Sequence, residues 1–346
     1  MASTATHQAA APSLEEEVLG ALGDTRERTL SLVGHLDEEA LTKVYSPIMS
    51  PLVWDLGHIA AYEDLWLAHR NAGLELLRGD LAGVYDAFET PRAVRGDIEA
   101  LGPADARKYL RAVRERVAAT IAEHGVGDRN ICEMVVRHEL QHTETMRQTM
   151  AIAGLLAPGE PSLQTRTGED EWIDVPAGAF AMGAGPDDFA YDNERPRHTV
   201  ELAGFAIASH PVTNADWGRF AEESALRGHP DAPVCHVSWF EAQAYAEAHE
   251  ARLPSEAEWE RAAAGGLLAG VGQVWEWTAS AFEGYPGFEA YPYKEYSEVF
   301  FGEDYKVLRG GSWATSERVK TVTFRNWDLP ERRQIFAGVR LARDAS

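Results

Sequence analysis

The chain has little cysteine, no long apolar run and few basic residues relative to acidic ones. Only two of its 346 residues are cysteines, Cys132 and Cys235, so no disulfide framework supports the fold and a reducing cytoplasm is the expected setting. No apolar run is long enough to span a membrane. The first residues lack the basic and apolar regions of a signal peptide, and we expect residues 1–12 to form a disordered tail.

Acidic residues outnumber basic ones by 55 to 32, which gives a formal net charge of -23 at pH 7. This charge would repel phosphate backbones, so we expect no nucleic acid and no anionic membrane as partner, whereas a local basic patch can still capture a small carboxylate. Apolar residues make up 45% and charged residues 25%, as in ordinary globular proteins. The length is sufficient for two domains.

Apolar periodicity divides the chain into a helical half and a mixed half. Helical patterns cover residues 13–35, 51–71, 104–124 and 128–154, and four helices of this length form a bundle whose core can hold a metal. A long glycine-broken loop, residues 72–103, interrupts them. A Pro-rich and Gly-rich linker follows at 158–170. Shorter helices are predicted at 214–223, 239–251 and 255–264, between short strands. The predicted class is α+β with two domains, residues 13–157 and 171–346.

Residues 138–142, with the sequence HELQH, place two imidazoles one helical turn apart. His138 and His142 therefore share one helix face, which supplies two of the three ligands of a metal site. The best third ligand is His58, on an earlier helix that we expect to begin with a Ser50 cap and a first-turn Pro51.

Two other interpretations of this motif follow from the residues alone. A bare pair of histidines four apart can consist of ordinary core or surface side chains. The pattern also matches the H-E-x-x-H motif of zinc proteases. We disfavour a protease because Glu139 lacks the expected downstream ligand pattern and a helical bundle offers no strand edge to a peptide substrate.

Several phrases of the second half resemble the domain shared by formylglycine-generating enzymes and ergothioneine-pathway sulfoxide synthases, a variant of the C-type lectin fold. These are MG at 182–183, NERP at 193–196, PVTN at 211–214, VSW at 237–239, RLPSEAEWE at 252–260, VWEWT at 274–278, LRGGSW at 308–313 and AGVR at 337–340. The first half is similar to the DinB-type bundle, which binds a metal through three histidines. This domain order resembles that of the iron-dependent sulfoxide synthases, in particular the hercynine oxygenases.

The resemblance implies a set of site residues. His58, His138 and His142 match the iron ligands, and Arg92 and Arg95 match the arginines that hold the carboxylates of the sulfur donor. The remaining matches are Gln141 and Asn326 near the trimethylhistidine, Asp328 facing the sulfur donor, Tyr293 as proton donor, and Tyr296 and Trp327 as further substrate-binding residues. From the residues alone, the arginines can also be solvated loop charges, and the tyrosines and Trp327 can be packing aromatics.

Two departures from the family patterns bear on function. Copper-dependent formylglycine-generating enzymes need a cysteine pair shortly after the RGGSW phrase, and residues 314–321 contain no cysteine, which excludes that chemistry. The stretches between Phe220 and Cys235 and between Ala264 and Val271 are shorter than expected for the family. We interpret them as trimmed surface loops, because the phrases on both sides persist.

The implied activity is Fe(II)- and O2-dependent C–S bond formation with sulfoxidation, which joins γ-glutamylcysteine or cysteine to the imidazole of hercynine (Nα,Nα,Nα-trimethylhistidine). Two loop arginines favour the γ-glutamyl donor, because they suit a substrate with an extra carboxylate. The alternatives are a synthase that joins cysteine to histidine, one that uses a selenosugar, and a zinc-dependent DinB-type thiol transferase or hydrolase. A non-enzymatic binding module would leave His58, Arg92 and Tyr293 without a common purpose.

Overall fold

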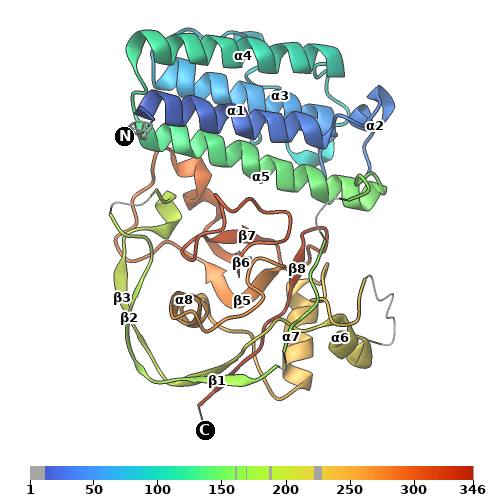
Figure 1. The fold of residues 1–346 in the computed structure, drawn as a ribbon, viewed down its shortest axis with the longest axis vertical. Coiled ribbons are helices and arrows are strands. Elements are labelled where there is room, and N and C mark those ends of the chain that lie inside the picture. Colours follow the sequence, from blue (N-terminus) through green and yellow to red (C-terminus); the bar gives the residue numbers. More distant parts are fainter. Residues whose placement is uncertain (1–11, 160–161, 169, 187–188, 222–227, 346) are drawn as a thin grey trace, which may run out of the picture. The chain divides into compact units, whose positions relative to one another are not determined.

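The computed structural model describes residues 12–159, 162–168, 170–186, 189–221 and 228–345. It divides into two compact units, Met1–Met146 and Arg147–Ser346. The first is helical and the second is mixed, which confirms the predicted α+β class (Figure 1). Residues 1–11 of the predicted tail lie outside the described residues. No helix within the described ranges combines the length and apolarity needed to cross a membrane.

Four long helices lie side by side in the first unit (Figure 1). They are α1 (Leu14–Leu32), α3 (Leu52–Glu63), α4 (Pro103–His124) and α5 (Arg129–Ala153), with a short α2 (Glu38–Thr42) between the first two. The bounds agree with the predicted helices to within a few residues. The exception is the predicted helix at 51–71, because its second half is the π-helix η1 (Asp64–Arg70).

Helix α3 is the centre of the bundle, because all of its residues except Ala61 are buried. The expectation that Ser50 caps this helix is wrong. Pro51 is the N-cap residue, and the Ser50 hydroxyl accepts a hydrogen bond from Arg95 at 2.8 Å instead. Proline fixes the φ angle needed at the start of the helix. The buried guanidinium of Arg95 needs hydrogen-bond acceptors, and the Ser50 hydroxyl supplies one.

A buried charge network ties the four long helices together. Arg26 of α1 donates to Glu139 of α5 at 2.9 Å and to Glu63 of α3 at 2.7 Å. Arg114 of α4 donates to Glu63 at 2.7 Å. Breaking one member of such a network leaves an uncompensated buried charge, so the network specifies how the helices pack.

The loop between η1 and α4 contains the 3-10 turns η2 (Gly79–Leu81) and η3 (Arg92–Val94). Tyr85 of this loop is 2% exposed and packs against α3 at Gly57, where a Cβ would overlap its ring. The glycine therefore permits the loop to approach the helix.

The second unit contains a four-stranded sheet, a three-stranded sheet and a hairpin, with strand orders β7-β6-β5-β8, β1-β4-β9 and β2-β3. The strands are β1 (Trp172–Val175), β2 (Gly178–Met182), β3 (His198–Leu202), β4 (Phe205–Ala208), β5 (Trp275–Phe282), β6 (Gly302–Arg309), β7 (Asn326–Asp328), β8 (Ala337–Gly338) and β9 (Ala342–Asp344). The helices are α6 (Asn214–Phe220), α7 (Trp239–Ala248) and α8 (Glu256–Ala264). The end of the predicted helix at 214–223 lies partly outside the described residues.

The predicted capping box of α8 is present, with Ser255 and Glu258 bonded to each other's main-chain N–H groups. Three buried ion pairs then hold the unit together: Glu256 with Arg325, Glu260 with Arg309, and Glu276 with Arg340. All three arginines are at most 1% exposed. Most of these residues belong to the phrases that carry the family resemblance, so those phrases encode the fold of this unit.

Candidate metal centre

Helices α3 and α5 bring the three predicted histidine ligands together. Ligand nitrogens of His58, His138 and His142 all lie within 4.8 Å of one another, and this is the one such cluster of potential metal ligands in the described part of the chain. Nε2 of His58 lies 3.1 Å from Nε2 of His138. Two nitrogens bound to one ion at the usual distance of about 2.1 Å are about 3 Å apart, so this spacing suits neighbouring ligands.

Hydrogen bonds orient two of the three rings. Nδ1 of His58 donates to the main-chain carbonyl of Tyr85 at 2.7 Å, because a carbonyl can only accept. Nδ1 of His142 lies 3.0 Å from Oδ1 of Asp55. A proton on each Nδ1 leaves each Nε2 with a free lone pair, which is the arrangement that metal-binding imidazoles need.

The electrostatic setting favours neutral imidazoles. Burial, together with the neighbouring rings, lowers the pKa of His58 and of His138 well below the ordinary value. Both rings are therefore neutral at pH 7 and do not have to lose a proton before they bind a cation.

Aromatic rings hold two ligands from the outside. Tyr62 stacks on His138 with ring centroids 3.6 Å apart, and Trp54 stacks on His58 with centroids 4.8 Å apart. The guanidinium of Arg95 lies over the Trp54 ring, 3.6 Å from its centroid. These contacts limit rotation of the imidazoles and place a cation near the cluster.

Arg95 is buried and its guanidinium bonds neutral acceptors. It donates to the carbonyls of Thr90 and Ala87 and to the Ser50 hydroxyl. Burial, with Arg92 as a nearby like charge, lowers the pKa of Arg95 to about 10, so it stays protonated at pH 7. Neither Arg95 nor Arg92 has a carboxylate within ion-pair distance among the described residues. Two cations of one loop with no described carboxylate at ion-pair distance form a site suited to an anion.

Glu139, the acidic residue of the HELQH motif, faces other partners. Its carboxylate accepts from Arg26 of α1 at 2.9 Å and from the Thr29 hydroxyl at 2.7 Å, and it is 2% exposed. The histidine cluster lies between α3 and α5. A zinc protease needs this glutamate as a general base beside the metal-bound water, so the arrangement gives no support to that alternative.

The remaining predicted residue of the bundle, Gln141, lies between the two histidines of α5 and is half-buried. The predicted residues of the second unit gather at one place within that unit. Tyr293 and Tyr296 have ring centroids 6.2 Å apart, and Tyr296 lies 6.0 Å from Trp327, edge to face in each pair. Asn326 and Asp328 flank Trp327 on β7.

The carboxylate of Asp328 has its own partners in the second unit. It accepts hydrogen bonds from the Leu329 N–H and from Gln334. Trp327 is also stacked on Phe282, with centroids 4.1 Å apart. The five predicted side chains of this unit are each half-buried: Tyr293, Tyr296, Asn326, Trp327 and Asp328.

Asp55, Trp54, Tyr62 and Tyr85 surround the histidine cluster, and sequence reasoning missed them. For Asp55 and Tyr62 a signal was present, because they lie three residues before and four residues after His58 and therefore share its helix face. Trp54 lies four residues before His58, so the helix spacing places it on the same face as well. Tyr85 had no such signal, since its contact with His58 depends on how the loop folds back.

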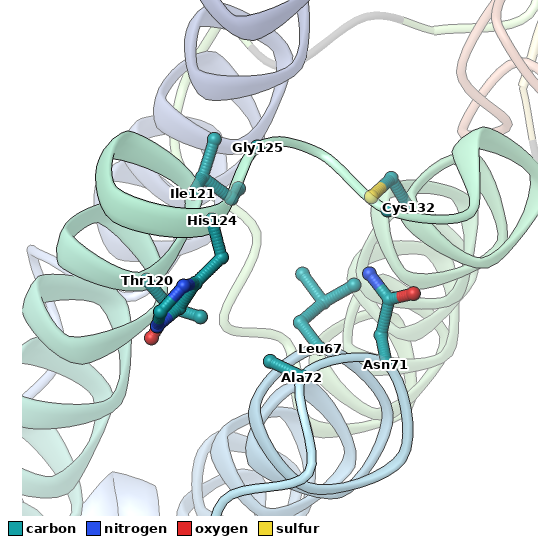
Figure 2. A pocket seen from close by; sticks show the side chains of 9 residues that line it. Leu67, Asn71, Ala72, Thr120, Ile121, His124, Gly125 and Cys132 are labelled. Atoms are coloured by element: carbon teal, nitrogen blue, oxygen red, sulfur yellow. The ribbon is translucent and has the colours of Figure 1, made fainter.

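A small cavity lies elsewhere in the bundle, at the turn between α4 and α5 (Figure 2). It is lined by Leu67, Asn71, Ala72, Thr120, Ile121, His124, Gly125, Gly127 and Cys132. None of the three histidines lines it. Burial raises the pKa of the Cys132 thiol to about 12, as expected for an inert core cysteine, whereas Cys235 is half-buried.

Comparison with known proteins agrees with this division of the chain. Residues 21–146 match the model of the DinB superfamily, and residues 157–270 and 266–345 match that of the sulfatase-modifying factor enzyme 1-like domain. The hercynine oxygenase of Mycolicibacterium thermoresistibile is 37% identical over 429 residues, with 95% of each chain covered. The chain belongs to the hercynine oxygenase family.

Other relatives define the limits of the likeness. The hercynine oxygenase of Mycobacterium tuberculosis is 36% identical over 425 residues, which cover 95% of this chain and 99% of that protein. The formylglycine-generating enzyme of Streptomyces coelicolor is 31% identical over 176 residues, but these cover only 36% of this chain and 55% of that enzyme. Likeness to hercynine oxygenases therefore extends over both units.

This chain is shorter than its family relatives in places. The alignment with the M. thermoresistibile protein takes 429 positions, whereas this chain has 346 residues, so segments of that relative have no counterpart here. The two matched pieces of the second domain meet at 266–270, inside the stretch where we expected a trimmed loop. In the structure α8 ends at Ala264, and residues 265–274 form the connection to β5.

Proposed function

We propose that this family member is an Fe(II)- and O2-dependent sulfoxide synthase that joins γ-glutamylcysteine to the imidazole of hercynine. The single observation that carries the proposal is the convergence of His58, His138 and His142 in a chain of this family. The reaction balances with one O2. The thiol S–H and the imidazole C–H are lost, a C–S bond forms, one oxygen atom remains on sulfur and the other leaves as water.

The donor set fits a ferrous ion. His58 and His138 are neutral, and Nδ1 of His58 and of His142 is bonded away from the cluster, which leaves Nε2 of each ring for the ion. Three imidazoles leave coordination positions open for small molecules. When bound, Fe(II) supplies the one-electron chemistry with O2 that side chains lack.

The arginine pair supports a donor that carries carboxylates. Arg95 is buried without a carboxylate partner among the described residues, and Arg92 is close enough to lower its pKa. Their guanidinium groups would bind the carboxylates of γ-glutamylcysteine, and Arg95 would do so beside the Trp54–His58 stack. Cysteine brings one carboxylate fewer, so the paired cations favour the dipeptide.

Residues of the second unit suit hercynine by their chemistry. The faces of Tyr293, Tyr296 and Trp327 would attract its quaternary ammonium. The amide of Asn326 would bind its carboxylate. Asp328 would pair with the amine of the sulfur donor. Tyr293 would donate the proton that directs the reaction to C–S bond formation instead of plain thiol oxidation. These roles follow from the family resemblance.

Metal-dependent turnover tests the proposal. Metal-free protein is loaded anaerobically with Fe(II) or Zn(II), mixed with hercynine and γ-glutamylcysteine, cysteine or a selenosugar, and exposed to O2. We expect O2 uptake and an adduct mass only with Fe(II), best with γ-glutamylcysteine, and neither in His138→Ala. Equal turnover with zinc would favour a thiol transferase, and no O2 uptake with any pair would refute the proposal.

A matched pair of variants tests the donor site. Arg92→Gln should raise the KM for γ-glutamylcysteine by about 10-fold or more, because a charge-assisted hydrogen bond is worth about 1.5–3 kcal/mol. The KM for hercynine should stay unchanged. Arg78→Gln is the control, since Arg78 lies in the same loop but is exposed and paired with Asp80. An unchanged donor KM in Arg92→Gln would contradict the assignment.

A further inference from the structure

Asp55 differs from three other buried carboxylates of the bundle, Glu63, Asp64 and Glu139. Glu63 and Glu139 are paired with Arg26 and Arg114, and Asp64 is paired with Arg116 at 3.0 Å. Asp55 has no such partner, and the hydrogen bond it accepts comes from His142.

The second oxygen of Asp55 has no hydrogen-bond partner among the described residues, although the side chain is 1% exposed. The positive charge of Arg95 acts on it through space, but the guanidinium bonds Ser50 and the carbonyls of Thr90 and Ala87. A buried carboxylate with a single neutral hydrogen-bond donor is energetically costly. The cost falls when a cation binds to Nε2 of the imidazole that donates to it.

We propose that Asp55 is a positioning residue of the metal centre, which holds His142 for coordination through Nε2 and supplies the negative charge that a divalent cation neutralises. This inference rests on the proposed metal site. A carboxylate behind a ligating histidine fixes its tautomer and increases its basicity, and its loss lowers metal affinity by about 10–100-fold. The three ligands are therefore unequal, because His58 is backed only by the neutral carbonyl of Tyr85.

Metal titration of the full chain tests the assignment without turnover. Metal-free protein is titrated with Co(II), whose absorption reports nitrogen ligation, and with Fe(II) under anaerobic competition from a chelator. Asp55→Asn keeps an acceptor of the same size but removes the charge, and we expect about 10-fold weaker binding. Asp55→Ala also removes the acceptor and should bind more weakly still.

Asp64→Asn is the matched control. Asp64 is equally buried and begins the π-helix that continues α3, but its carboxylate bonds the Leu77 N–H and Arg116. This variant should lose stability yet keep its metal Kd within about two-fold, because Asp64 touches no ligand. Equal affinity of wild type and Asp55→Asn would overturn the inference, whereas a wild type that binds no metal would refute the proposed function itself.

A measurement on the wild type covers the case in which the Asp55 variants fail to fold. In the metal-loaded protein, nitrogen NMR of the histidines should show His142 with a proton on Nδ1 and metal on Nε2. Coordination of His142 through Nδ1 would overturn the inference, since Asp55 would then have no proton to accept.

Discussion

Gly57 offers a sharp test of the packing behind the three clustered histidines. A Cβ at this position would overlap the ring of Tyr85, which is 2% exposed. The Tyr85 hydroxyl accepts from the Leu101 N–H at 3.0 Å, and its carbonyl accepts from His58 at 2.7 Å. Tyr85 is therefore held at its hydroxyl and at its main chain, and it cannot move without disturbing the loop or His58.

The expected size of the effect follows from three contributions. Overpacking of a buried ring costs about 1–3 kcal/mol. Loss of the hydrogen bond from Leu101 to Tyr85 adds about 1 kcal/mol. Alanine in place of glycine in a helix recovers about 1 kcal/mol. We therefore expect Gly57→Ala to lower the free energy of unfolding by about 1–3 kcal/mol and to weaken metal binding several-fold.

Urea unfolding followed by circular dichroism at 222 nm measures the stability, and Co(II) titration measures the binding. Gly23→Ala in α1 is the control, because a Cβ at Gly23 meets no atom within 4 Å. This variant should stabilise the protein by about 0.5–1 kcal/mol. If Gly57→Ala were as stable as Gly23→Ala, the tight contact between Tyr85 and α3 would be absent and the reasoning would fail.

Three further predictions concern the charge network, pH and product. Arg26→Met should cost about 3–5 kcal/mol in urea unfolding, and a double variant with Glu139→Gln should cost less than the sum of the single variants, since each single change leaves the buried network with one excess charge and the double change restores the balance. Because burial lowers the pKa values of His58 and His138, the unfolded chain takes up protons first as the pH falls. Metal-free protein should therefore lose stability below about pH 6.5, by up to about 1.4 kcal/mol per pH unit for each ring, and a flat urea profile from pH 7 to pH 5 would contradict this. Tyr293→Phe should shift product toward the sulfinic acid of the donor, whereas unchanged partition by mass spectrometry would remove Tyr293 from its role.

Local patterns were sufficient for the helices and for part of the candidate site. His138 and His142 are four residues apart, and helix geometry alone places them on one face. The capping residues of α8 were also predictable, because a capping box involves only residues within one turn.

The expectations that failed depend on distant contacts. Ser50 has the right residue type and position for a helix cap, but Arg95, 45 residues later, uses its hydroxyl. The sequence pattern of residues 51–71 predicts one continuous helix, but its second half is the π-helix η1. Asp64, the first residue of η1, accepts hydrogen bonds from the Leu77 N–H and from Arg116. Propensity describes what a segment prefers in isolation, and such partners are absent from that description.

The sequence by itself determined the helical and mixed halves, the family and which three histidines the fold brings together. The helix period and short motifs depend on neighbouring residues, so they can be read from the chain. Only the tertiary structure decided that Nδ1 of His58 and of His142 is hydrogen-bonded, that Glu139 belongs to a charge network, and that Asp55 lies behind His142. Those facts depend on side chains brought together from separate helices and a loop, and their hydrogen bonds exist only after the chain has folded.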